Sequence, residues 1–452
     1  MQTLASIGVD WGTHSSKWTW SLMELDSSKI IRGPFKILHS DVRLEGASNK
    51  IFLSDETPPT GSICASRVKR KLITDTDGSF WVGPQRGIKL TRGELVSFSI
   101  WFLLGEAYQN LCDATGKESG EIDVRFSIPN WVDSDASAVG RALYEQAARV
   151  ACHIFAGDRQ AWSQVPNPLR EEWQESVRAA LEILNISDES EIDTDRQGYQ
   201  SLLKRSFNVA EDVKFRFVAE SSAAGLAGLR NAEVETEEKK YLRKILVVDV
   251  GAGSTDIGYV IRAIPPKGSD AKEFLCQLPP ANTCESAGDD LSRRILEICR
   301  SRGEDIGFSE AERRKTVGED KGWLTHPAVV EWRRTIADHV RRYVTDIPDM
   351  HRLYSLPGLQ VLLTGGSGVV GGLQDAVLDA AREGLHERKV HFNVVEATNL
   401  MELNLEGPDA KDANRLAVAI GAASEDLPGL SYHPKLERPP RVPTVRIKPS
   451  WT

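Results

Sequence analysis

The stretches Ile7-Gly-Val-Asp-Trp-Gly-Thr-His-Ser-Ser-Lys17 and Leu246-Val-Val-Asp-Val-Gly-Ala-Gly-Ser-Thr-Asp256 decide the fold of this chain. Each is an apolar strand that ends in aspartate, followed by a turn of small residues and the start of a second strand. Asp10-x-Gly12 lies in the first half of the chain and Asp249-x-Gly251 in the second. One copy alone is compatible with an ordinary β-hairpin. Two copies predict a pair of hairpins that face each other and hold a triphosphate.

The residue types in the two turns suit a phosphate site. Glycine and small residues let backbone N–H groups approach phosphate oxygens, and Thr13, Ser15 and Ser254 add hydroxyl donors. Asp10 and Asp249 would be repelled by phosphates, but they can hold the water molecules around a Mg²⁺ ion. Lys17 lies close enough in sequence to reach the β- and γ-phosphates as a point charge. We therefore predict ATP and Mg²⁺ as cofactors.

Composition narrows the class of protein. A chain of 452 residues exceeds one hydrophobic core, so at least two domains are expected. The net charge of −9 argues against general nucleic-acid binding. We expect no signal peptide and no membrane segment, because the apolar window 98–104 is too short to span a bilayer. Six cysteines without a C-x-x-C pair predict reduced thiols in a cytoplasmic protein.

A third stretch, Val361-Leu-Leu-Thr-Gly-Gly-Ser-Gly-Val-Val-Gly-Gly-Leu373, joins a strand to a helix. It contains a G-x-G-x-x-G match at Gly366, Gly368 and Gly371, and Glu396 ends a later strand, so a dinucleotide site is an alternative interpretation. Too little chain follows for a complete doubly wound domain, and this alternative leaves both aspartate hairpins unexplained.

The chain divides by composition into three parts. Residues 1–232 form a first lobe that contains a polar, turn-rich region over 26–91 and a helical insertion over about 156–212. The charged segment 233–240 begins a second lobe over 233–423. Residues 424–452 form a proline-rich, basic tail, which is either a partner-binding arm or a disordered end.

In their order, the three stretches resemble the phosphate-1, phosphate-2 and adenosine motifs of the superfamily that joins actin, sugar kinases and DnaK-type heat-shock chaperones. Phe217-Val-Ala-Glu-Ser-Ser-Ala-Ala-Gly-Leu-Ala227, Ala287-Gly-Asp-Asp-Leu291 and the closing helix Leu416–Ala423 resemble the DnaK-type branch. The resemblance implies an α/β, two-lobed actin-like ATPase fold of duplicated ribonuclease-H-like domains. The closing helix would pack back between the lobes, and the peptide-binding β-domain of the chaperones is missing.

The resemblance also implies roles for individual residues. Asp10, Glu220 and Asp249 would be catalytic, organising Mg²⁺ and the attacking water. The nucleotide would be bound by Gly12, Thr13, His14, Ser15, Lys17, Gly251, Ala252, Gly253, Ser254, Gly288, Asp289, Glu312, Lys315, Gly365, Gly366 and Ser367. Simpler interpretations stay open: Glu220 as a helix-start carboxylate, Asp289 as an N-cap, and 311–315 as a solvated charged helix.

Some positions depart from the DnaK-type pattern. His14 stands where those proteins carry a hydroxyl residue, and Lys17 has the position found in actin. The lysine expected after Val82-Gly83 has no clear equivalent, because Arg86 and Lys89 are out of register.

These features predict a chaperone-like ATPase that closes its lobes around Mg·ATP and regulates a protein partner or client. A filament-forming, self-assembling actin-like ATPase is the main alternative. A small-molecule kinase and a pseudo-ATPase that binds without hydrolysis are further alternatives.

Overall fold

The computed structural model shows a mixed α/β protein with several sheets, in which parallel and antiparallel strand pairs both occur and about half of the described residues are helical. The described residues are 3–24, 29–45, 48–53, 63–65, 68–69, 90–116, 118, 120–129, 135–157, 159, 167–186, 199–231, 242–263, 274–284, 286–317, 322–346, 359–387, 395–398, 413–424 and 431–432.

The first large sheet is built on the first aspartate hairpin. Its strands are β3 (Lys29–Arg32), β2 (Ser15–Glu24), β1 (Thr3–Asp10), β8 (Glu121–Ile128), β10 (Val213–Ala219) and β9 (Ser206–Asn208), in that spatial order, with β4 (Lys36–His39) also paired to β2. β1 is antiparallel to β2 and parallel to β8, and β8 is parallel to β10.

The second large sheet is built on the second hairpin. Its strands are β15 (Val395–Thr398), β14 (Leu359–Thr364), β11 (Leu242–Val250), β12 (Thr255–Ala263), β13 (Phe274–Cys284) and β16 (Ser431–Tyr432). With the short strands β4, β9 and β16 set aside, each sheet, counted from its own first strand, has five strands in the order 3-2-1-4-5. The hairpins also share one register, because Asp10 lies opposite Lys17 and Asp249 lies opposite Asp256.

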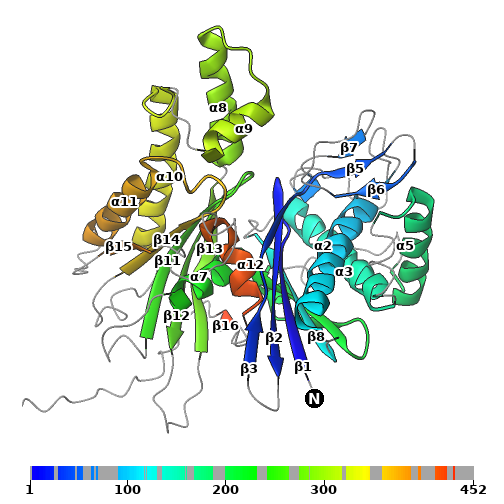
Figure 1. Ribbon diagram of the computed structural model, residues 1–452. Helices are drawn as coiled ribbons and strands as arrows, with labels where there is room; N and C mark the ends of the chain where they lie inside the picture. Colours follow the sequence, from blue (N-terminus) through cyan, green and yellow to red (C-terminus); the bar gives the residue numbers. More distant parts are fainter. Residues whose placement is uncertain are drawn as a thin grey trace, which may run out of the picture.

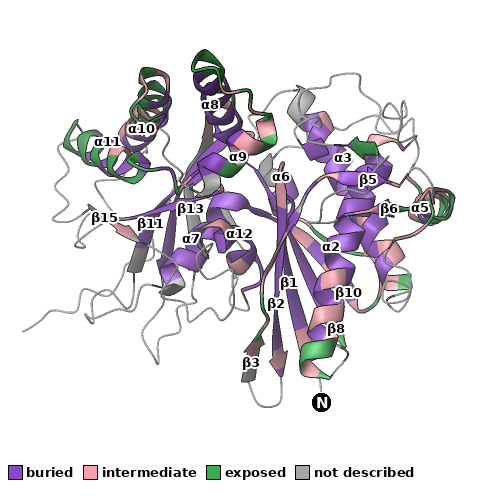
Figure 2. Cartoon of the chain, turned by 45° about the horizontal axis from the view of Figure 1, so that its top comes forward, coloured by how far each residue is buried: buried purple, intermediate pink, exposed green. Residues whose placement is uncertain are grey.

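Helices cover the outer face of each sheet and fill the space between the two (Figure 1). The helices of the first half are α2 (Arg92–Thr115), α3 (Asp135–Gly157), α5 (Arg170–Leu184) and the short α6 (Tyr199–Leu203). Those of the second half are α8 (Gly288–Ser301), α9 (Phe308–Val317), α10 (Pro327–Asp346) and α11 (Leu373–Glu387). Each half has its own apolar core. The buried surfaces of both sheets and the exposed outer sides of α10 and α11 are visible in Figure 2.

Two helices, α7 (Glu220–Asn231) and α12 (Ala413–Ala422), lie between the sheets. Their apolar side chains form a third buried cluster together with residues of β11, β12 and β14. Backbones approach closely here: a Cβ at Gly421 would lie 1.7 Å from Ala223 O, and one at Gly8 would lie 2.4 Å from Ala419 O. Because α12 contacts β1 of the first sheet and β14 of the second, it ties the two halves together.

Two regions differ from expectation. The turn-rich region 26–91 contributes short strands: β3 and β4 in the first large sheet, and β5 (Val42–Leu44), β6 (Ile51–Phe52) and β7 (Ile63–Ala65) in a separate small sheet. Strands of two to four residues are too short to show an alternating pattern. The expected insertion is not wholly helical, because β9 joins the first sheet, where Phe207 stacks on Phe215 with ring centroids 4.7 Å apart.

The segment 233–240 and most of the tail lie outside the described residues. Among the helices that the structure describes, none has the length and apolar character needed to cross a membrane.

Candidate functional site

A network of buried charged side chains surrounds Asp10 at the end of β1. Lys17 Nζ donates to Asp10 Oδ2 over 2.7 Å, and Ser127 Oγ donates to Asp10 Oδ1 over 2.9 Å. Ser127 Oγ also lies 3.4 Å from Glu220 Oε1. Lys69 Nζ donates to the same Glu220 oxygen over 2.7 Å. The Ser127 hydroxyl therefore lies between two carboxylates, and each carboxylate accepts a hydrogen bond from its own buried lysine.

The strand order brings these residues together. β1, β8 and β10 are parallel, so their carboxyl ends lie at one edge of the sheet. Asp10 is the last residue of β1, Ser127 is next to last in β8, and Glu220 begins α7 directly after β10. Functional groups in α/β proteins collect at this edge because strands end there and loops begin.

Burial and charge shift the pKa values of this network in opposite directions. Burial raises the pKa of Asp10, but Lys17 and Lys69, with hydrogen bonds from Lys17 and Ser127, outweigh it and leave that pKa below its usual range. Burial raises the pKa of Glu220 to about 7. The positive charge of Lys69 opposes this rise, and the negative charges of Asp10 and Asp256 add to it. Burial lowers the pKa of Lys69, but Glu220 and Asp10 reverse this and raise it. Asp10 is therefore ionised at neutral pH, while Glu220 is poised to exchange a proton.

The raised pKa of Glu220 predicts a pH-dependent stability. Its ordinary value is 4.5 and its folded value about 7, so the folded protein holds the proton more tightly than the unfolded chain does. The resulting stability is complete below pH 4.5 and is lost as the pH rises through about 7. Glu220→Gln should remove this loss, which is on the order of 2 kcal/mol. Urea unfolding of wild type and variant at about pH 5 and about pH 8 measures the difference.

The matched control is Glu310→Gln. Glu310 is a surface carboxylate whose pKa is lowered to about 2 by hydrogen bonds from Arg313 and Arg314, so it stays ionised throughout this pH range. Its variant should keep the wild-type pH dependence. Parallel stability curves for wild type and Glu220→Gln would contradict the prediction.

Asp249 faces this network from the second sheet. Burial raises its pKa well above the usual value, and the negative charges of Glu220, Asp10 and Asp256 add to the effect. Lys17 opposes them only in part. The two strand-end aspartates, which were predicted to act together, therefore lie close enough to influence each other. A positive charge placed beside Asp249 would therefore stabilise its ionised form.

The two hairpin turns have similar local geometry. In the second turn Gly251 N donates to Ser254 O over 2.9 Å, and a Cβ on Gly251 would lie 3.1 Å from that oxygen. In the first turn a Cβ on Gly12 would lie 2.2 Å from Ser15 O. A side chain at the first position would clash with the backbone, and one at the equivalent second position would be crowded by it. The other predicted turn residues, Thr13, His14, Ala252 and Gly253, are half-buried.

The start of α8 is fastened to the second turn. Gly288 N donates to Gly251 O over 2.8 Å, and Asp289 N donates to Ala252 O over 2.9 Å. A Cβ on Gly288 would lie 2.2 Å from Ser367 Oγ. The glycine at 288 therefore permits a close approach among α8, the second turn and the segment after β14.

Residues predicted to border the nucleoside also converge here. Lys315 Nζ, which is buried, donates to Gly288 O over 3.2 Å and pairs with Glu312 over 2.8 Å. Ser367 N donates to Val250 O over 3.1 Å, so the glycine-rich segment after β14 lies against the second hairpin. Within that segment Gly365 is tightly enclosed, whereas a Cβ on Gly366 would meet nothing within 4 Å.

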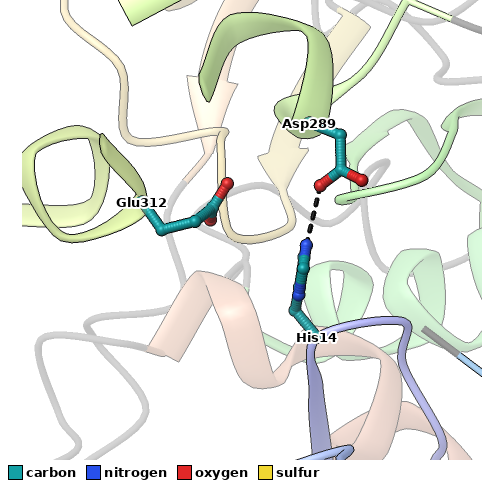
Figure 3. A group of neighbouring side chains, drawn as sticks. All are labelled: His14, Asp289 and Glu312. Carbon is teal, nitrogen blue, oxygen red and sulfur yellow. Dashed lines mark hydrogen bonds and ion pairs between the residues drawn. The ribbon is translucent and has the colours of Figure 1, made fainter. Parts of the chain in front are cut away.

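One predicted residue of the first turn reaches the second half. His14 Nε2 donates to Asp289 Oδ1 over 2.7 Å, and the carboxylate of Glu312 lies nearby (Figure 3). The three ligand atoms of His14, Asp289 and Glu312 fall within 4.8 Å of one another, so this group could also hold a metal ion. The two turns are therefore brought to one place.

Sequence reasoning missed Lys69 and Ser127. Lys69 supplies a buried cation beside Glu220. The DnaK-type pattern places its lysine near Arg86 and Lys89, which lie outside the described residues. Nothing local marks Lys69, since neighbouring Arg67, Arg70 and Lys71 are equally basic. Ser127 had a weak signal: it is a small polar residue near the end of a strand stopped by proline.

The structure also has a cavity of about 240 Å³ beside β2 and α2, lined in part by Trp18, Phe35 and Glu106. None of its lining residues belongs to the charged network. The groups suited to phosphate binding and proton transfer are the buried charges and the glycine turns, which lie apart from this cavity.

Comparison with known proteins finds no family model and no curated protein sequence that matches this chain.

Proposed function

We propose that this chain is a two-lobed ATPase of the actin, sugar kinase and heat-shock chaperone superfamily, nearest to the DnaK-type branch. One observation carries the proposal: two sheets of the same 3-2-1-4-5 order bring equivalent strand-end aspartates, Asp10 and Asp249, to opposite sides of one site. The duplicated ribonuclease-H-like architecture of that superfamily accounts for this order. Mg·ATP would bind between the two turns.

The residues fit a hydrated Mg²⁺ ion and a triphosphate. Asp10 is ionised, and burial together with the neighbouring carboxylates raises the pKa of Asp249, so a bound cation would stabilise the ionised form of Asp249. Oxygen ligands of this kind suit Mg²⁺, which keeps several water molecules. When bound, the ion supplies positive charge against the phosphates. The glycine turns leave backbone N–H groups accessible for phosphate oxygens.

The chain's own residues suit hydrolysis. Phosphoryl transfer depends on positioning and on charge stabilisation. Lys69 places a buried positive charge beside Asp10 and Glu220, where charge develops on a transferring phosphoryl group. Glu220, with a pKa of about 7, can accept a proton from an attacking water, and Ser127 orients both carboxylates.

The nucleotide state would be signalled to a protein partner or client through the contact between halves. α12 packs against both halves, so a change in their relative position moves a surface that a partner could recognise. This part of the proposal rests on the resemblance to DnaK-type chaperones.

Binding and hydrolysis of ATP by the full chain test the proposal. Isothermal titration should show one ATP bound in a Mg²⁺-dependent manner, and phosphate release should follow. Asp249→Asn should lower the Mg²⁺-dependent activity about 10- to 100-fold, since it removes an outer-shell partner of the ion. Asp379→Asn on the exposed surface of α11 is the matched control and should behave as wild type.

Other outcomes would favour the alternatives. Nucleotide-dependent pelleting at high speed would support a filament-forming actin-like protein. ATP consumption that requires a sugar or an acid would support a small-molecule kinase. Binding without phosphate release, unchanged in Asp249→Asn, would support a pseudo-ATPase. Absence of Mg·ATP binding would overturn the proposal.

A further inference from the structure

His14 and Asp289 join the two halves of the protein at the candidate site. They are 275 positions apart in sequence, yet His14 Nε2 and Asp289 Oδ1 are 2.7 Å apart. His14 comes from the turn between β1 and β2, and Asp289 from the first turn of α8 (Figure 3). A direct side-chain bond thus spans the two groups of elements to which we assign phosphate binding.

Both partners are anchored to their own half. Asp289 is fixed to the second turn by the bond from its N–H to Ala252 O. The residue before α8 is fixed as well, because Trp332 Nε1 donates to Ala287 O over 3.0 Å. On the other side His14 O accepts a hydrogen bond from Ser40 N over 2.9 Å. The anchor of His14 follows β4 of the first sheet, whereas those of Asp289 and Ala287 lie in the hairpin turn of the second sheet and in α10. Movement of one half relative to the other must therefore strain or break the His14–Asp289 bond.

The bond lies in a partly enclosed setting. The Asp289 side chain is 1% exposed and the His14 side chain 28% exposed. The Phe308 ring of α9 lies beside the imidazole, with centroids 6.1 Å apart. A buried carboxylate is costly unless a donor satisfies it, so the imidazole N–H stabilises Asp289.

We infer that His14 and Asp289 form a latch between the halves that a nucleotide displaces. This inference rests on the proposed function. The Nε2–H of His14 can donate to Asp289 or to a phosphate oxygen at the first turn, and one N–H cannot fully satisfy both. Phosphate near the first turn would also be repelled by Asp289. Phosphate binding and the latch therefore oppose each other, and the free energy of the latch is subtracted from that of nucleotide binding.

The experiment compares two neighbouring aspartates. Asp289→Asn keeps the side-chain shape but weakens the latch, and should raise the affinity of the full chain for Mg·ATP about 5- to 10-fold. Asp290→Asn is the matched control: Asp290 pairs with Arg293 and accepts a hydrogen bond from Ala287 N, which asparagine can also accept, so its variant should leave affinity unchanged. His14→Ala removes the latch and also a phosphate donor, so it should show no such gain.

Hydrogen–deuterium exchange without nucleotide gives a second readout. His14→Ala and Asp289→Asn should each speed exchange in peptides that cover both the first turn and the start of α8, because each variant releases the two turns from one another. Asp290→Asn should not speed exchange in the first turn.

The outcomes separate the two proposals. Equal affinity gains in Asp289→Asn and Asp290→Asn would show a general charge effect and overturn the latch. Normal ATP binding with unchanged exchange in His14→Ala would overturn only the latch. Wild-type protein that binds no Mg·ATP would overturn the proposed function and nucleotide displacement together. One zinc ion bound per wild-type chain, and lost in His14→Ala, would replace the latch by a metal site at His14, Asp289 and Glu312.

Discussion

Lys69→Ala is expected to lower the rate of ATP hydrolysis by about 10²–10³, the usual loss when one preorganised donor to developing charge is removed. Lys69 is buried, bonds to Glu220 over 2.7 Å and acts on the charge of Asp10. ATP affinity should change little, because the lysine would act mainly on the charge that develops during transfer. Single-turnover phosphate release, with affinity measured separately by titration, distinguishes the two effects.

Loss of folding is the main competing explanation for this result. Removing one partner of a buried ion pair costs about 3–5 kcal/mol. The double variant Lys69→Ala with Glu220→Gln also removes the unpaired carboxylate, so it should recover stability. Its stability alone is compared, because Glu220 is itself the proposed proton acceptor, and hydrolysis by Lys69→Ala is measured under conditions in which that variant is folded. Lys36→Ala is the matched control, since Lys36 pairs with Glu106 and its side chain is 43% exposed. Near-normal hydrolysis by folded Lys69→Ala would contradict the assigned role.

Gly365→Ala is expected to destabilise the protein by about 2–5 kcal/mol and to abolish nucleotide binding. Gly365 has φ +85°, in the left-handed region that side chains rarely adopt. An added Cβ would lie 2.4 Å from Asp249 Oδ1 and 2.5 Å from Val250 O. The substitution therefore displaces the strand-end carboxylate itself. Urea unfolding and ATP titration measure both effects.

The neighbouring glycine provides the control. Gly366 has no such φ, and a Cβ there would meet nothing within 4 Å. Gly366→Ala should change stability by less than about 0.5 kcal/mol. Its effect on ATP affinity shows whether adenosine passes close to this backbone. If Gly365→Ala and Gly366→Ala had equal stability, the crowding at Gly365 would not constrain the site.

Much of the secondary structure could be predicted from sequence. Apolar spacing in the sequence predicts a strand over Leu359–Thr364 and helices over 94–111 and 327–344, and the structure has β14, α2 and α10 at these places. These elements carry long apolar patterns with one clear period. The short strands between β2 and α2 could not be predicted, because segments of two to four residues are too short to show an alternating pattern.

The site was predictable only in part. The spacing of aspartate, glycine and serine in the two hairpins located both turns, and their common register follows from equal loop lengths. The sequence contained no sign that Lys69 would meet Glu220, since 151 positions separate them.

The sequence by itself determined two strand–turn–strand hairpins, because apolar alternation and glycine turns act over about ten residues. Only the tertiary structure decided which charges neutralise one another. Asp10 meets Ser127 because β1 and β8 are parallel neighbours, and His14 meets Asp289 because helix packing brings the two turns together. Strand order and helix packing depend on the whole chain, so no local pattern specifies these contacts.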